Sequence, residues 1–133
     1  MSKENTKKIL IVDDNKDLRK ILVNTLHAEN LTVLEAGNGE DGLALALSEH
    51  PDLILLDVVM PKMDGITMLQ KLRKDTWGRG AWIIMLTNLT DAEKVHSAME
   101  EGVYDFLVKG DWSLENLLSK IRLKLDLSNN NKS

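Results

Sequence analysis

Five short apolar runs alternate with five segments of helical periodicity, and no other feature of the sequence constrains the fold as strongly. The apolar runs, which we expect to be strands, span residues 7–13, 31–36, 52–57, 81–87 and 104–109. Helices are expected over 16–30, 39–50, 65–74, 91–102 and 113–127, with Asn38 capping the second and Ser113 the last. Strands that alternate with helices form a parallel sheet covered on both faces. The sequence therefore predicts an α/β fold with a doubly wound, five-stranded parallel sheet and five helices.

Length and composition favour one folded domain over residues 7–127, after a flexible segment 1–6 and before a disordered tail 128–133. The net charge is only −4 and the basic residues are scattered, so we expect no direct contact with nucleic acid. Cysteine is absent, which suits a reducing cytoplasm. No apolar run approaches the roughly 18 residues of a membrane span, and we expect no membrane association.

Polar residues gather where the expected strands end. The carboxyl ends of strands one, three, four and five carry Asp13, Asp14, Asp57, Thr87 and Lys109. In a flavodoxin-like strand order 2-1-3-4-5, strands one and three are neighbours, and ligands bind at this edge of the sheet. The three carboxylates would then converge.

Three carboxylates need a cation beside them, and a hard divalent ion such as Mg²⁺ suits oxygen ligands. Lys109 offers a mobile positive charge for an anion, and Thr87 offers a hydroxyl. Carboxylates, a metal, a lysine and a hydroxyl together resemble a site for phosphoryl transfer, in which a carboxylate can itself become an aspartyl-phosphate.

With these residues, the chain resembles the receiver domain of two-component response regulators over roughly residues 7–126. Four segments carry the resemblance: ILIVDDN for the acidic pair, LILLDVVMPKMDG for the phosphoacceptor, MLTN for the threonine and YDFLVKG for the lysine. The resemblance implies that Asp57 accepts the phosphoryl group. It also implies that Asp14 binds Mg²⁺ directly, Asp13 through water, and the Val59 backbone carbonyl as a further ligand.

The same resemblance implies that Lys109 contacts the phosphoryl oxygens, that Thr87 moves to hydrogen-bond them, and that Phe106 turns inward as a switch. The phosphodonor would be a histidine kinase or a histidine phosphotransfer protein. The domain would catalyse its own phosphorylation and dephosphorylation, yet its role would be signalling through a partner-binding surface, not enzymatic turnover.

The sequence departs from the usual pattern of the family in two ways. Gly110 replaces the proline that usually follows the lysine, so a trans Lys109–Gly110 bond is favoured, because a cis bond without proline costs roughly 3–4 kcal/mol. Val59 and Leu89 are apolar where a polar side chain would hold a water for attack on the acyl phosphate. We therefore expect a long-lived phosphorylated state.

The last helix has apolar residues on two sides. One stripe is expected to face the sheet: Leu114, Leu117, Leu118, Ile121 and Leu125. Trp112, Leu123 and Leu127 fall on the opposite side. They are either isolated exposed apolar residues or part of a partner or homodimer surface formed by the fourth helix, fifth strand and fifth helix, which the family uses for output.

Other features admit alternative readings. The segment GNGEDG, 37–42, spells a dinucleotide-binding fingerprint, but a turn that starts a helix is the simpler reading. His27, His50 and His96 are expected at the surface, and Trp82 in the core or at the start of its strand. Two other functions stay open: a non-phosphorylating interaction module, suggested by Gly110, and a Mg²⁺-dependent phosphohydrolase or nucleotide-binding enzyme.

Overall fold

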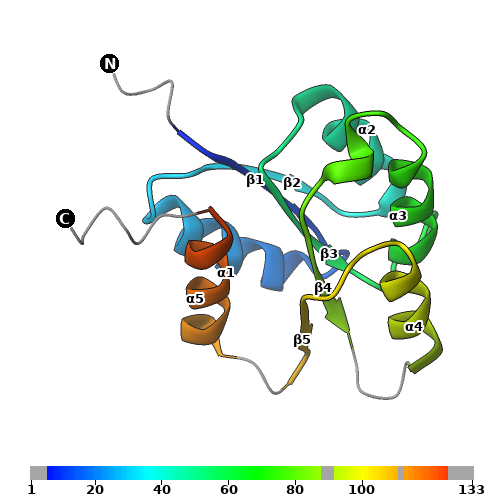
Figure 1. Ribbon diagram of the computed structural model, residues 1–133. Coiled ribbons are helices and arrows are strands. Elements are labelled where there is room, and N and C mark those ends of the chain that lie inside the picture. The colour runs from blue at the N-terminus through cyan, green and yellow to red at the C-terminus, as the bar shows by residue number, and fades with distance from the viewer. Residues whose placement is uncertain (1–5, 88–91, 111–112, 126–133) are drawn as a thin grey trace.

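The computed structural model describes residues 6–87, 92–110 and 113–125 (Figure 1). Strands and helices alternate as expected. The strands are β1 (Lys8–Val12), β2 (Thr32–Ala36), β3 (Leu53–Asp57), β4 (Ile83–Thr87) and β5 (Phe106–Val108). The helices are α1 (Lys16–His27), α2 (Gly39–Glu49), α3 (Gly65–Arg73), the short 3-10 helix η2 (Gly78–Gly80), α4 (Ala92–Glu100) and α5 (Leu114–Leu125).

All five strands are parallel and lie in the order β2-β1-β3-β4-β5, which confirms the predicted topology. β1 and β3 are paired with Val12 opposite Leu56, so the residues that follow these two positions, Asp13 and Asp57, emerge side by side. The strand order therefore brings the acidic residues of the first and third apolar runs to one place.

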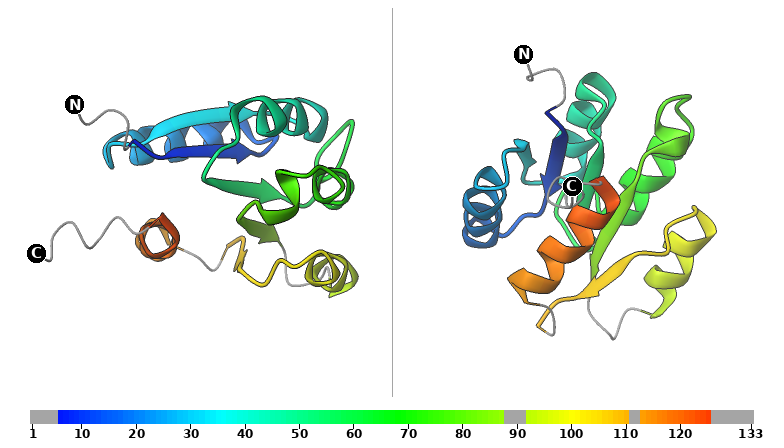
Figure 2. Two further views of the ribbon diagram at one scale, coloured as in Figure 1. Left: turned by 45° about the horizontal axis from the view of Figure 1, so that its top comes forward. Right: turned by 60° about the vertical axis from the view of Figure 1, so that its left-hand side comes forward.

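Two hydrophobic layers cover the sheet. On one face, buried residues of α1 and α5 pack against alternate strand residues such as Ile9, Leu55 and Ile84. On the other face, α2, α3 and α4 pack against the intervening residues, such as Leu10 and Leu56. The right-hand view of Figure 2 shows α3 and α4 on one side of the sheet and α1 on the other. Strands buried on both faces explain the near-continuous apolar runs in the sequence.

Side chains cap the helices where the sequence offers them. Asn38 accepts a hydrogen bond from the Asp41 backbone N–H at 2.9 Å, which confirms it as the cap of α2. Ser113 Oγ likewise accepts from the Asn116 N–H at 3.1 Å at the start of α5. Such caps satisfy N–H groups that have no partner within the helix, and they fix where each helix begins.

Trp82 lies outside the core. β4 begins at Ile83, so Trp82 precedes the strand, and half of its surface (50%) is exposed. Its ring packs beneath the Lys124 ammonium, 4.9 Å from the ring centroid. The prediction that Trp82 lies in the core is therefore wrong, and the residue instead lies immediately before the start of the strand, near the alternative position.

Leu114, which was expected to face the sheet, is exposed at the first turn of α5, so the buried stripe begins only at Leu117. The prediction for Leu114 is therefore wrong.

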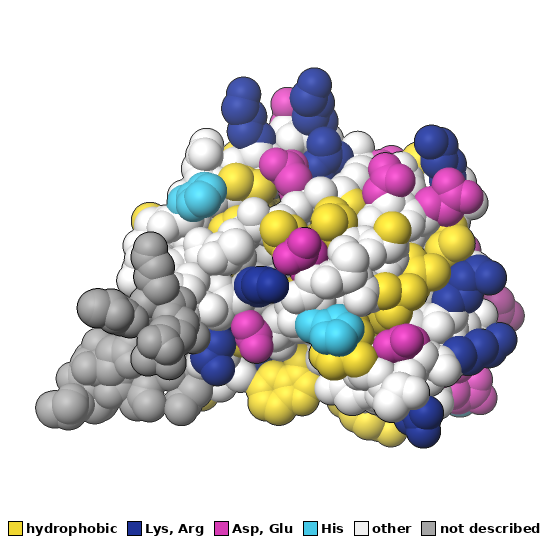
Figure 3. Space-filling view, turned by 90° about the horizontal axis from the view of Figure 1, so that it is seen from above, with side chains coloured by type: hydrophobic (Ala, Val, Ile, Leu, Met, Phe, Trp, Pro, Cys, Tyr) yellow, Lys and Arg dark blue, Asp and Glu magenta, His cyan; other side chains and the backbone are white. Residues whose placement is uncertain are grey.

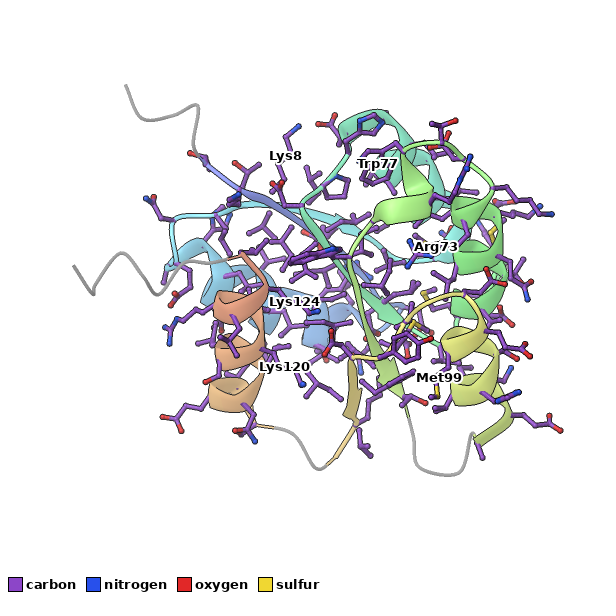
Figure 4. All side chains as sticks on the ribbon, viewed as in Figure 1. Lys8, Arg73, Trp77, Met99, Lys120 and Lys124 are labelled. Carbon is purple, nitrogen blue, oxygen red and sulfur yellow. The ribbon has the colours of Figure 1, made fainter. Side chains whose placement is uncertain are left out.

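The histidines lie at the surface as expected, and His50 stacks on Trp77 with ring centroids 4.3 Å apart. Figure 4 labels Trp77. None of the helices in the described part of the chain is long and apolar enough to cross a membrane. The predicted segments 1–6 and 128–133 lie outside the described residues, apart from residue 6.

Candidate functional site

Three carboxylates meet at the carboxyl edge of the sheet. One oxygen each from Asp13, Asp14 and Asp57 lies within 4.8 Å of the others. Asp13 is fully buried and Asp57 is 3% exposed, whereas Asp14 faces solvent. Two of the three charges are thus removed from water, which is costly unless a cation is near.

Lys109 supplies one cation. Its Nζ lies 2.9 Å from Asp57 Oδ1 and 3.6 Å from Asp13 Oδ2. The backbone N–H of Lys109 donates to the Thr87 carbonyl at 2.7 Å, which fixes the residue at the end of β5. The described chain contains no cis peptide bond, so the Lys109–Gly110 bond is trans as expected, and Gly110 adopts a left-handed φ of 94°. The trans bond still lets the lysine reach the acidic residues.

Burial governs the electrostatics of Asp57. Burial, helped by the charges of Asp13 and Asp14 and opposed by the Lys109 hydrogen bond, raises the pKa of Asp57 from 3.8 to about 6. For Lys109, burial alone would lower the pKa of the ammonium, but the hydrogen bond to Asp57 and the charges of Asp57 and Asp13 outweigh it, so its pKa is raised. The single positive charge of Lys109 therefore does not balance the negative charge of the three carboxylates.

The donor set fits Mg²⁺. Asp13 Oδ2 is buried and accepts no hydrogen bond from the described residues, although the Lys109 ammonium lies 3.6 Å away. A buried carboxylate oxygen without a donor, beside two more carboxylates, matches the all-oxygen ligand set that Mg²⁺ prefers. Asp13, Asp14 and Asp57 are the residues that would hold the ion.

The loop that follows Asp57 is held close to the sheet. Gly65 N–H donates to the Val58 carbonyl at 2.8 Å, and a Cβ on Gly65 would overlap the Asp57 carbonyl. Val59 projects into solvent and is 57% exposed. The role of its carbonyl as a metal ligand stays a prediction.

Thr87 and Phe106 lie on the lysine side of the site. Thr87 is buried at the end of β4, the strand beside β3, and Phe106 opens β5 and packs half-buried against the core. Thr87 thus ends the strand beside that of Asp57, whereas Phe106 lies two strands from Asp57, and the movement of both on phosphorylation stays a prediction. Leu89, Trp112 and Leu127 lie outside the described residues.

Sequence reasoning missed Arg19. Its Nη1 donates to the Asp13 carbonyl at 2.8 Å, and its Nε donates to Glu35 Oε1 at 3.0 Å. The sequence did offer a signal for Arg19, because a basic residue stands one turn into the helix that follows the acidic pair. Its target on β2 depends on the strand order and could not be read from local sequence.

The glycines of the segment 37–42 pack against protein. Gly39 N–H donates to the Met63 carbonyl at 3.0 Å, a Cβ on Gly39 would overlap that carbonyl, and a Cβ on Gly42 would press on Val12. The close backbone approach that a dinucleotide site would use is taken by the loop after β3. The simpler reading of this segment, a turn that starts a helix, is confirmed.

Residues 9–122 match the family model of the response regulator receiver domain. The chain is 40% identical over 126 residues to the probable transcriptional regulator ycf27 of Cyanophora paradoxa, covering 95% of this chain and 51% of that protein. It is 34% identical over 118 residues to the DNA-binding dual master transcriptional regulator RpaA of Synechocystis sp., covering 89% of this chain and 48% of that protein. The chain thus spans about half the length of these curated relatives.

Solved structures agree with the fold. The chemotaxis response regulator CheY4 of Vibrio cholerae superposes with a TM-score of 0.81 at 31% identity, covering 90% of this chain and 98% of that one. A CheY-like response regulator receiver domain protein from Methanospirillum hungatei JF-1 superposes with a TM-score of 0.83 at 31% identity, covering 91% and 94%.

Proposed function

Because the chain belongs to the family of response regulator receiver domains, we propose that Asp57 takes a phosphoryl group from a histidine kinase or a histidine phosphotransfer protein. One observation carries this proposal: the buried Asp57 carboxylate lies 2.9 Å from Lys109 and shares its site with Asp13, whose Oδ2 lacks a hydrogen-bond donor among the described residues. Such a site is deficient in positive charge and suited to a metal and a phosphoryl group.

The transfer is a displacement at phosphorus. An oxygen of Asp57 attacks the phosphorus of the donor phosphohistidine, the new O–P bond forms as the P–N bond breaks, and the electron pair leaves with the imidazole nitrogen. Asp57 must be ionised to attack, and a pKa of about 6 leaves it mostly ionised above pH 7. When bound by Asp13, Asp14, Asp57 and the Val59 carbonyl, Mg²⁺ would neutralise charge on the phosphoryl oxygens.

Lys109 has the geometry to follow the new phosphoryl group. Its Nζ already contacts Asp57 Oδ1, so a phosphoryl group on that carboxylate would carry its oxygens toward the same ammonium. Thr87, at the end of the neighbouring strand, would donate its hydroxyl to those oxygens, and Phe106 would turn inward with it. The phosphoryl charge would thus shift the conformational equilibrium of the surface that contains β5.

We place the output surface on α4, β5 and α5. Leu123 on α5 is 78% exposed, and Met99 on α4 and Tyr104 before β5 are exposed as well. Lys120 and Lys124 of α5 pair with Asp105 next to β5, at 3.8 and 2.5 Å. Figure 4 labels the two lysines and Met99. An exposed leucine beside paired charges suits a protein partner or a second copy of the chain.

Direct binding to nucleic acid is not part of the proposal. The face in Figure 3, which looks onto the edge of the sheet where β1 begins, shows basic and acidic side chains interspersed, and a nucleic-acid surface would gather basic ones. DNA binding by the relative RpaA is stated in its name and belongs to that protein. We propose a cytoplasmic setting for this chain because it has no cysteine.

The test uses acetyl phosphate as a small phosphodonor. The protein is mixed with Mg²⁺ and acetyl phosphate, and its intact mass is recorded beside that of Asp57→Asn. One added phosphoryl group on the wild type, absent from the variant and prevented by EDTA, would support the proposal. Absence of an adduct despite Mg²⁺ binding would favour the non-phosphorylating module. Steady phosphate release from a generic phosphate ester would favour the phosphohydrolase.

The alternative of a non-phosphorylating module rested on Gly110 displacing Lys109. The 2.9 Å contact between Lys109 and Asp57 counts against that argument, because the lysine reaches Asp57 through a trans bond.

A further inference from the structure

Arg19 bridges the acidic site and the β2 strand. In the second turn of α1, its guanidinium donates through Nη1 to the Asp13 carbonyl at 2.8 Å and through Nε to Glu35 Oε1 at 3.0 Å. The planar fork of arginine lets one side chain hold both partners at fixed angles, which a lysine ammonium does not.

The turn between β2 and α2 lies against the Arg19 guanidinium. A Cβ on Gly37 would lie 3.0 Å from Arg19 Nη1, tighter than most such contacts, so an alanine at this position would press on the guanidinium. Two residues on, Gly39 donates to the Met63 carbonyl in the loop after Asp57. The same turn therefore supports both loops that carry the carboxylates.

The orientation of the Asp13 carboxylate depends on the contacts of the Asp13 backbone. Its N–H donates to the Ala36 carbonyl at 3.1 Å, and its Oδ1 accepts from the Asn15 N–H at 2.9 Å. These contacts and the Arg19 bond to its carbonyl fix the peptide from which the buried Oδ2 projects. A peptide rotated by the loss of one contact would carry that oxygen away from Asp57.

We propose that Arg19, seated against Gly37, is a positioning residue for the metal site and sets its affinity for Mg²⁺. This rests on the proposed function, in which Asp13, Asp14 and Asp57 bind the ion. Partners one step removed from a metal ligand commonly matter in this way, and their loss weakens binding about 10- to 100-fold.

Charge alone predicts the opposite sign. Arg19 is a cation next to Asp13, so removing its charge would strengthen the binding of another cation by Coulomb's law. Positioning instead predicts weaker binding when the fork is lost. Arg19→Lys keeps the charge and removes the fork, and therefore isolates positioning.

The experiment measures the Mg²⁺ dissociation constant of the full chain by titration calorimetry. Arg19→Lys is expected to bind about tenfold more weakly than the wild type. Gly37→Ala, which keeps Arg19 but pushes its guanidinium, is expected to weaken binding in the same direction. The double variant should be no weaker than Arg19→Lys alone, since both act through one contact. Lys20→Arg, the reverse exchange at the next position of α1, is the matched control and should leave the constant unchanged.

Folding is not expected to confound the result. Arg19 and Gly37 line an open groove of about 730 Å³ between α1 and α2, so water can replace the displaced atoms. Thermal unfolding without metal checks that the variants fold. If Arg19→Lys does not fold, Gly37→Ala alone tests the positioning role.

The outcomes separate the two proposals. No Mg²⁺ binding by the wild type would refute the proposed function itself. Binding by the wild type with an equal constant for Arg19→Lys and Gly37→Ala would overturn the positioning role and leave the function standing. Tighter binding by Arg19→Met together with an unchanged Arg19→Lys would mean that Arg19 acts only as a charge.

Discussion

The buried charge of Asp57 should lower the stability of the metal-free protein. Burial raises the pKa of Asp57 from 3.8 to about 6. A difference of roughly two pKa units corresponds to about 3 kcal/mol of unfolding free energy at pH 7.5. Asp57→Asn removes the charge and keeps the shape, so we expect the variant to be more stable than the wild type by about 1–3 kcal/mol.

The sign of the pH dependence follows from the same shift. Because the folded pKa exceeds the unfolded one, the folded state binds more protons between pH 3.8 and about 6. The contribution of Asp57 to unfolding free energy therefore rises as pH falls through about 6 toward 4, and Asp57→Asn lacks this term. The stability difference between the two proteins should shrink over that window.

Thermal unfolding in EDTA at several pH values measures this effect. For a domain of this size, 1 kcal/mol shifts the midpoint by roughly 4 °C, so a rise of about 4–12 °C is expected at pH 7.5. Asp17→Asn, at an exposed carboxylate in the first turn of α1, is the control and should change stability by less than about 0.5 kcal/mol. Equal or lower stability of Asp57→Asn at pH 7.5, with a gap that does not depend on pH, would refute the reasoning.

Three further predictions concern the lysine, the output surface and the lifetime of the phosphorylated state. Lys109→Met should slow phosphorylation by acetyl phosphate roughly 100-fold, because the ammonium 2.9 Å from Asp57 is lost; an unchanged time course by intact mass would contradict its role. Leu123→Glu should reduce self-association or partner binding in sedimentation without changing phosphorylation, and unaltered association would remove Leu123 from the surface. The acyl phosphate should decay slowly, and Val59→Asn should shorten its half-life by providing a polar group for water; rapid decay of the wild type would count against this account.

The fold and most of the site could be predicted because both follow from strand order. Once β1 and β3 are neighbours, Asp13 and Asp57 must emerge together, and Lys109 at the end of β5 needs only the length of its side chain to reach them. Each of these residues ends an apolar run, which local sequence shows directly.

What could not be predicted depends on contacts between segments far apart in the chain. Trp82 sits in an apolar run, but the sheet begins one residue later, and its partner Lys124 lies on the last helix. Arg19 finds Glu35 only after β2 takes its place beside β1. Periodicity reports which face a residue occupies and says nothing about such pairings.

The carboxylates and the lysine of the site are held by strands that differ in how many neighbouring strands they pair with. Asp13 follows β1 and Asp57 ends β3, and both strands have neighbours on either side. Lys109 follows β5, a three-residue strand that, within the described residues, pairs with β4 alone. Amide hydrogens of β5 should accordingly exchange with solvent through local opening, at a lower free energy than global unfolding requires. We therefore expect the Lys109 ammonium to leave the acidic cluster by local opening of β5 while the carboxylates stay in place, which would change the charge balance of the site without loosening the core.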